Sequence, residues 1–156
     1  MRRKEKEISD PSKLEAMIRS AKVCRVGFSD NGQPYIVPMS FGYQDNILYF
    51  HCAKEGRKIE CIRQNPQVCF EFDEDATPLP HEKACRWSMK YKSIIGYGRV
   101  EFIRGTEDKR CALEIIMRQY SQEQFEFPAP EIEKITIFKI VIEQMSGKKS
   151  GYEMIP

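Results

Sequence analysis

The sequence lacks the features that would place it in a membrane, in the secretory pathway or on nucleic acid. No apolar run approaches the ~20 residues that a membrane-spanning helix needs, and the first ten residues lack the apolar stretch of a signal peptide. The 25 basic and 23 acidic residues leave a net charge of only +2, so no overall attraction to nucleic acid or to an anionic membrane is expected. We therefore predict a cytoplasmic protein with neither a nucleic-acid nor a membrane partner.

Motifs for metals and for common enzyme sites are also missing. The six cysteines include no CxxC pair and lie mostly in apolar stretches, where a reduced thiol behaves as a small hydrophobic residue. The two histidines have no partner at zinc spacing, and the acidic run at residues 71–75 lacks the pattern of a calcium loop. Walker, Rossmann and nucleophile-elbow patterns do not occur. The sequence therefore predicts no metal site.

What is present suits one domain: 156 residues, of which 41% are hydrophobic. Apolar periodicity predicts a mainly β protein with helices (α+β), in which six or so antiparallel strands form a closed barrel and the first three make a meander. Three helices are expected to begin near Pro11, Gly56 and Thr106, the first and last capped by Asp10 and Thr106. We expect flexible tails at 1–9 and 147–156 and a loop at 74–83. The predicted strands are Val23–Ser29, Pro34–Ser40, Ile47–Cys52, Gln67–Asp73, Ala84–Arg104 and Ile135–Ile142.

The residues best suited to bind a ligand lie where the third predicted strand ends and a helix begins. There, Gly56 is followed by two cations, Arg57 and Lys58. Free backbone N–H groups and the positive end of a helix dipole gather at such a corner, and they suit a phosphate. Arg can bind phosphate oxygens through two N–H groups, and Lys adds a point charge. The alternative is a solvated basic helix start without a ligand.

Three other stretches leave both a functional and a structural interpretation open. Pro38 cannot donate a ladder hydrogen bond, so its strand is either an ordinary edge strand or one whose free backbone groups contact a flat heterocycle. His51 ends an apolar strand and is either a ligand contact or a satisfied polar group. Aromatic and basic residues interleave between Arg86 and Arg99, as in an RNA-binding surface or a subunit interface around an anionic ligand. The small net charge argues against RNA.

These stretches, in this order, resemble the FMN-binding split-barrel proteins related to pyridoxamine 5′-phosphate oxidase. The likeness is greatest to the nitroimidazole-resistance (Nim-like) branch and extends from about Lys13 to Ile142. The segments that carry it are Gly32–Ser40, Leu48–Ala53 with Gly56–Lys58, and Tyr91–Glu101. The resemblance implies a single split-barrel domain that forms a homodimer, with FMN in two clefts between the subunits.

The resemblance also implies which residues bind the cofactor. Arg57 and Lys58 would hold the FMN phosphate, and Tyr91, Ser93 and Gly96 would complete the cleft, from the partner subunit. His51 could face a substrate on the isoalloxazine side. The backbone segments expected along the isoalloxazine are Val37, Pro38, Met39 and Ser40, and Phe50, His51, Cys52 and Ala53.

The activity implied by the resemblance is that of an FMN-dependent reductase. NAD(P)H would reduce the flavin, and the flavin would pass electrons to an electron-poor acceptor such as a nitroimidazole. The cofactor supplies the redox chemistry, which explains why no acid–base pair is visible. The alternative is a flavin- or haem-binding carrier or redox sensor, with His51 as a haem ligand. The chain lacks the substrate-phosphate residues and the C-terminal extension of a true pyridoxamine 5′-phosphate oxidase, so vitamin B6 oxidation is not predicted.

Overall fold

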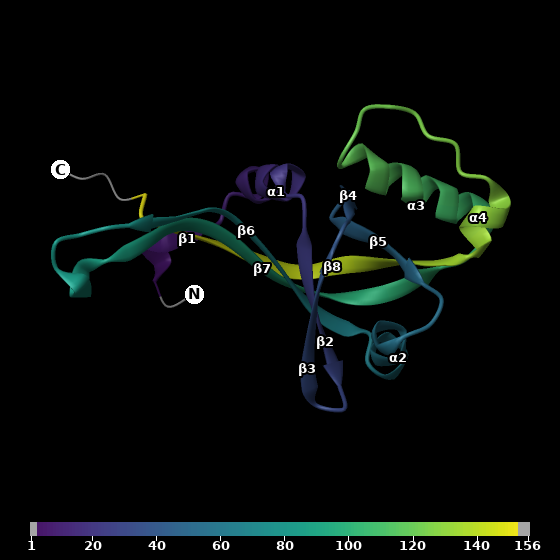
Figure 1. The fold of residues 1–156 in the computed structure, drawn as a ribbon, viewed down its shortest axis with the longest axis horizontal. Coiled ribbons are helices and arrows are strands. Elements are labelled where there is room, and N and C mark those ends of the chain that lie inside the picture. The colour runs from purple at the N-terminus through teal and green to yellow at the C-terminus, as the bar shows by residue number, and fades with distance from the viewer. Residues whose placement is uncertain (1–2, 153–156) are drawn as a thin grey trace.

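One antiparallel sheet of eight strands forms the frame of the molecule in this computed structural model, which describes residues 3–152 (Figure 1). The sheet order is β3-β2-β6-β7-β8-β5-β4, and the short β1 pairs with β8. This is the mainly β fold class that the sequence predicts, with β1, β4 and α4 as elements that the prediction missed. The strands are β1 (Glu7–Ile8), β2 (Cys24–Asp30), β3 (Gln33–Met39), β4 (Gly42–Gln44), β5 (Ile47–Ala53), β6 (Gln67–Leu79), β7 (Ser88–Ile103) and β8 (Ile135–Ser150). The helices are α1 (Pro11–Ser20), α2 (Arg57–Gln64), α3 (Thr106–Arg118) and α4 (Ala129–Glu133), with 3-10 turns η1 (Lys4–Lys6) and η2 (Ala84–Arg86).

The sheet curves but does not close, which corrects the closed barrel expected from the sequence. The edge strands β3 and β4 follow one another in the chain, yet among the described residues β3 pairs only with β2 and β4 only with β5. The predicted three-strand meander was therefore wrong. At the corner between the edge strands, the backbone N–H of Phe41 donates to the Tyr120 hydroxyl at 2.9 Å instead of to a strand. The architecture is a split barrel with two free strand edges.

Tyr120, just beyond α3, ties this corner in place, because its hydroxyl also donates to the Lys22 carbonyl at 3.0 Å. Tyr120→Phe removes both hydrogen bonds and leaves the Phe41 N–H without a partner. We expect the free energy of unfolding, measured by urea denaturation, to fall by about 1–3 kcal/mol. Tyr49→Phe is the control, since the Tyr49 hydroxyl makes no hydrogen bond to any described residue, and it should change little. Equal losses in the two variants would contradict this role.

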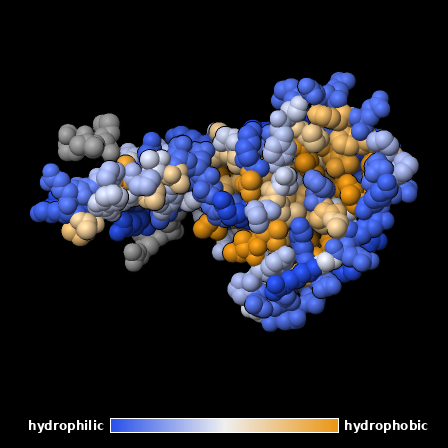
Figure 2. Space-filling view, in the orientation of Figure 1, coloured by the Kyte–Doolittle hydropathy of each residue, from blue (hydrophilic) through white to orange (hydrophobic). Residues whose placement is uncertain are grey.

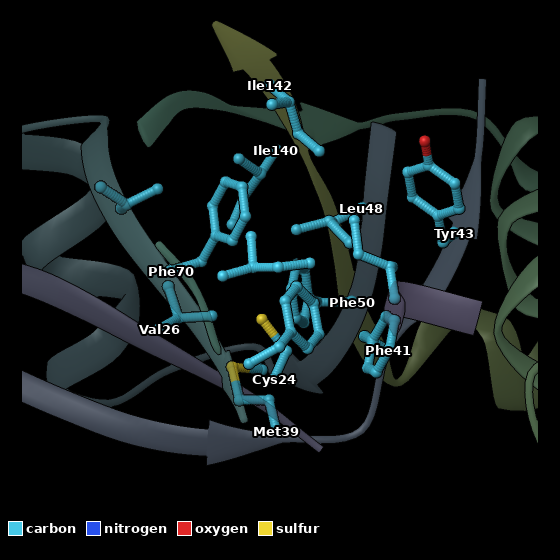
Figure 3. Packing of buried hydrophobic residues seen from close by; sticks show 14 of the residues in the cluster. Cys24, Val26, Met39, Phe41, Tyr43, Leu48, Phe50, Phe70, Ile140 and Ile142 are labelled. Carbon is cyan, nitrogen blue, oxygen red and sulfur yellow. The ribbon is translucent and has the colours of Figure 1, made fainter. Parts of the chain in front are cut away.

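The inner face of the sheet carries the main core (Figure 3). Strand β6 alternates as predicted, with Phe70 and Phe72 each only 1% exposed. Phe50 of β5 stacks on Phe138 of β8, with 5.2 Å between ring centroids. The neighbouring Ile137 belongs instead to a second cluster with residues of α3 and α4. Strand β8 is therefore buried on both faces here, as its continuous apolar run indicates.

Local backbone chemistry accounts for the ends of two helices. The Asp10 carboxylate accepts a hydrogen bond from the Ser12 N–H at 3.0 Å, so the predicted cap of α1 is confirmed. The sequence predicts Thr106 as the cap of helix α3. This was wrong, because Thr106 is already the first residue of the helix. Gly105 occupies the cap position with φ 85, a conformation that favours glycine.

Within the described range, no helix has the length and apolar character needed to cross a membrane.

Strands β6 and β7 continue beyond the barrel as an arm (Figure 1), in which β8 also pairs with β7 as far as Tyr91. Strand β6 runs to Leu79, so the loop predicted from Glu74 onward was wrong over this stretch. The pairing shifts after Glu74, where Asp75 has φ 61. Past its pairing with β2, strand β6 has no described strand on its other side, and Pro78 is tolerated at such an edge.

Two stretches near the ends of the chain pair in the sheet, although the sequence predicts flexible tails at 1–9 and 147–156. Strand β1 pairs with the last part of β8, and Ile8 is buried in the main core. Strand β8 continues to residue 150, so the tail prediction does not hold for the paired parts of the chain. Positions 1–2 and 153–156 lie outside the described residues.

Candidate functional site

The predicted strand-to-helix corner is present, since β5 leads through a short turn into α2, whose first residue is Arg57. Gly56 before it has φ 121 and ψ 168, a conformation rarely open to residues with a Cβ. No described side chain caps the helix, and the first hydrogen bonds to the Gly56 carbonyl come from its third and fourth residues. The backbone N–H groups of Arg57 and Lys58 are therefore available to an anion, in the positive field of the helix dipole.

The Arg57 side chain is held by the β2–β3 hairpin. Its Nε donates to Oδ2 of Asp30 at 2.7 Å, and its guanidinium carbon lies 4.4 Å from the centre of the Tyr35 ring. The side chain remains 46% exposed, so the guanidinium is open to solvent. Sequence reasoning missed Asp30 and Tyr35 as part of this site. The Asp-Asn-Gly run indicated only a turn, which Asn31 and Gly32 do form at positive φ.

Lys58 connects the corner to the two backbone segments expected to line a ring. Its Nζ lies 3.7 Å from the Met39 sulfur at the end of β3. Partial burial and then the Lys58 charge lower the pKa of His51, so its imidazole is neutral at neutral pH. Burial raises the pKa of the Cys52 thiol, and the Lys58 charge opposes that rise. The structure therefore gathers these predicted residues of β3, β5 and α2 around one cation.

Both backbone segments have an unpaired edge. Strand β3 pairs only with β2 among the described residues, which confirms the edge position predicted from Pro38. Strand β5 pairs with β8 through Ala53, but its other side meets β4 only as far as Tyr49. The backbone groups of residues 37–40 and 50–53 can therefore hydrogen-bond a flat polar ring.

The side chains of these segments differ in exposure. Met39 is 7% exposed and Phe50 is fully buried, so both side chains belong to the core, and only their backbone could contact a ligand. Val37 and Cys52 are half-buried. The exposed members are Pro38, Ser40, His51 and Ala53.

The three predicted residues of β7 do not join the corner within the chain. Gly96 lies in the same row as Val37 but is separated from it by β2 and β6, roughly 14 Å at the usual strand spacing. A Cβ on Gly96 would lie 2.1 Å from the Phe70 ring, so core packing explains this glycine. Ser93 and Tyr91 lie further out, toward the arm, opposite residues 148 and 150 of β8.

A cavity of about 560 Å³ between α1 and the arm includes none of the predicted site residues. Its lining mixes charges of both signs, including Lys13, Lys92 and Glu74, with apolar residues such as Met17. The predicted chemistry lies instead at the α2 corner.

The outer face of the sheet carries an exposed apolar patch, which we call the outer patch. Its members are Ile36 of β3, Cys69 of β6, and Ile95 and Tyr97 of β7. The register places Ile36, Cys69 and Tyr97 in one row through Gly27 of β2. Ile36 is 66% exposed, and Ile95 and Tyr97 are each 49% exposed. Figure 2 shows apolar surface on the body of the molecule and a mostly hydrophilic arm.

Comparisons with known proteins agree with this fold. A family model described as pyridoxamine 5′-phosphate oxidase matches residues 10–149. The chain is 40% identical to a candidate 5-nitroimidazole antibiotic resistance protein from Bacteroides thetaiotaomicron, with a TM-score of 0.83 over 91% of this chain and 85% of the other. An FAD- and haem-binding protein from Mycobacterium smegmatis is 16% identical, with a TM-score of 0.84 over 94% of this chain and 74% of that one, which shows a shared fold.

A curated relative adds sequence support but little information on activity. An uncharacterized protein from Rhizobium meliloti (strain 1021) is 26% identical over 93 residues, which are 60% of this chain and 54% of that protein. The aligned part of the chain thus spans about half the length of this relative.

An open, curved antiparallel sheet with a basic strand-to-helix corner defines a split-barrel protein. The family match covers far more than half of the chain, and the chain belongs to the pyridoxamine 5′-phosphate oxidase family. The resemblance stated from the sequence motifs, including the likeness to nitroimidazole-resistance proteins, is thereby confirmed.

Proposed function

We propose that this protein binds FMN, with the flavin phosphate at the start of α2. The observation that carries the proposal is the convergence of Arg57, Lys58 and two unpaired strand edges at one corner. The phosphate of FMN carries about two negative charges, which two cations and a helix start can balance. The edges of residues 37–40 and 50–53 would hydrogen-bond the isoalloxazine. Flavin-binding proteins among the structural neighbours support the same cofactor class.

The second part of the proposal is a homodimer with FMN at the interface. Within one chain the corner lacks Tyr91, Ser93 and Gly96, which lie across and along the sheet from it. A second copy can supply β7 to the corner of the first copy. The outer patch favours this arrangement, since exposed apolar rows on a sheet face are typical of protein interfaces.

The activity that we propose is reduction of an electron-poor acceptor such as a nitroimidazole. FMN held by Arg57 and Lys58 would supply the redox chemistry for transfer of electrons from NAD(P)H to the acceptor. The chain itself would bind and orient the flavin. The neutral imidazole of His51, exposed beside the isoalloxazine segments, would hydrogen-bond the acceptor. The described similarity to a nitroimidazole-resistance protein at 40% identity supports this acceptor class. All six cysteines are free, which suits the reducing cytoplasm where we place the protein.

Purification and spectroscopy test the cofactor. We expect a yellow protein whose heat-released supernatant contains FMN, and we expect the refilled protein to oxidise NADH or NADPH in the presence of a nitroimidazole. Flavin binding without turnover would favour the carrier or sensor alternative. A Soret band whose intensity depends on His51 would indicate that the cofactor is haem and not FMN. A colourless protein that takes up neither cofactor would refute the proposal.

A further inference from the structure

We propose that Asp30 and Tyr35 are positioning residues that hold Arg57 in the orientation needed to receive a phosphate. The inference rests on the proposed FMN site but concerns residues outside the segments that would contact the flavin. Asp30 ends β2, Tyr35 lies in β3, and Arg57 begins α2, so the contact joins the hairpin to the phosphate corner.

The geometry leaves the phosphate-binding side of the guanidinium free. A guanidinium has five N–H donors, and Asp30 takes only the one on Nε. Within the described part of the chain, the Nη1 and Nη2 groups of Arg57 make no hydrogen bond. They are the pair that can bind two oxygens of one phosphate. The guanidinium carbon lies over the Tyr35 ring, and this cation–π contact restricts movement of the side chain.

The hairpin that carries the two residues is itself well fixed. Phe28 and Tyr35 are directly paired across β2 and β3, with 6.1 Å between their ring centroids. Asn31 and Gly32 form the turn at φ 50 and φ 87, which sets the direction of the Asp30 side chain. Asp30 is better shielded than Arg57, with 26% of its side chain exposed against 46%. The carboxylate is therefore the fixed partner and the arginine the positioned one.

Two opposing effects decide whether Asp30 strengthens or weakens the binding of FMN. An unrestrained arginine loses rotamer freedom when it binds a ligand, and a preformed orientation removes that loss from the binding step. The Asp30 carboxylate also repels a phosphate nearby, but the high dielectric of the solvent at this exposed surface keeps that repulsion weak. We expect the positioning effect to be the larger.

Binding titrations of FMN and riboflavin distinguish the two effects, because riboflavin lacks the phosphate. Asp30→Ala should weaken FMN binding roughly five- to tenfold and leave riboflavin binding unchanged. Asp30→Asn, which keeps an acceptor for Nε, should lose roughly two- to threefold. In an Arg57→Ala background, Asp30→Ala should have no further effect on either flavin. Tyr35→Leu should weaken FMN binding and Tyr35→Phe should not.

The matched control is Asp45→Asn, which removes the same charge from the turn between β4 and β5. It should leave both dissociation constants unchanged. Tighter or unchanged FMN binding by Asp30→Ala would overturn the inference, as would equal weakening of FMN and riboflavin, which would indicate a purely structural role. A wild-type protein that binds neither flavin would refute the proposed function and this inference together, whereas wild-type FMN binding with an insensitive Asp30 would refute the inference alone.

Discussion

Simultaneous replacement of Arg57 and Lys58 by alanine is expected to weaken FMN binding by about two to four orders of magnitude. A hydrogen bond to a charged group contributes about 1.5–3 kcal/mol, and two such contacts would be lost. Neither residue is in the core: Arg57 is exposed and Lys58 half-buried. The variant should therefore keep its fold, which circular dichroism and thermal unfolding can check. The dissociation constant follows from quenching of flavin fluorescence.

The control for this variant removes two cations elsewhere. Lys22→Ala with Arg63→Ala changes the net charge equally, and Arg63 lies in the last turn of the same helix. This control should bind FMN within about twofold of the wild type, since Arg63 lies at the opposite end of the helix from the proposed phosphate site and solvent weakens the attraction of such exposed charges. Riboflavin should bind the Arg57/Lys58 variant as it binds the wild type. An unchanged FMN dissociation constant in that variant would mean that the phosphate binds elsewhere.

The basic strand-to-helix corner could be predicted from sequence because its signals are local. The strand before Gly56, the glycine itself and the cations after it occupy one short stretch, and each has a chemistry that does not depend on distant residues. The edge position of Pro38 was predictable for the same reason, since the missing N–H is a property of the residue.

The contacts made by distant parts of the chain could not be predicted in this way. Asp30 and Arg57 are far apart in sequence, and nothing in the Asp-Asn-Gly turn indicates which cation it meets. Closure of the barrel depended on whether β3 and β4 pair. Among the described residues they do not, and the N–H of Phe41 between them donates to the Tyr120 hydroxyl. The sequence analysis missed the arm because Pro78 suggested a loop. In the structure Pro78 lies within β6, where the unpaired edge of the strand accommodates it.

Gly96 shows how one residue can satisfy a motif and still have a structural cause. The resemblance assigns it to the flavin cleft, and the Phe70 ring occupies the space that its Cβ would need. Both roles are compatible only if the Gly96 backbone contacts a flavin bound at the corner of a second copy. A role in flavin binding for these residues of β7 therefore depends on the dimer.

Tyr97→Glu is expected to convert the proposed homodimer into a monomer that no longer retains FMN. Tyr97 is 49% exposed in the outer patch, in line with Ile36 and Cys69. A dimer about a two-fold axis would bury one unpaired carboxylate from each subunit, and each would cost several kcal/mol. The dimer dissociation constant should rise by at least about three orders of magnitude. Analytical ultracentrifugation at micromolar protein, followed at the flavin absorbance, measures assembly and cofactor retention together.

Phe125→Glu provides the matched control, because Phe125 is 40% exposed and lies in the segment between α3 and α4, outside the outer patch. It should remain dimeric and yellow, which separates the effect of the outer patch from that of an added charge. The proposed interface would be refuted by a Tyr97→Glu protein that still sediments as a dimer. A monomeric Tyr97→Glu protein that keeps FMN would instead mean that one chain completes the site, and Tyr91, Ser93 and Gly96 would then have no part in it. Loss of dimer and flavin together is the outcome expected if the corner of one subunit and β7 of its partner share a single cofactor.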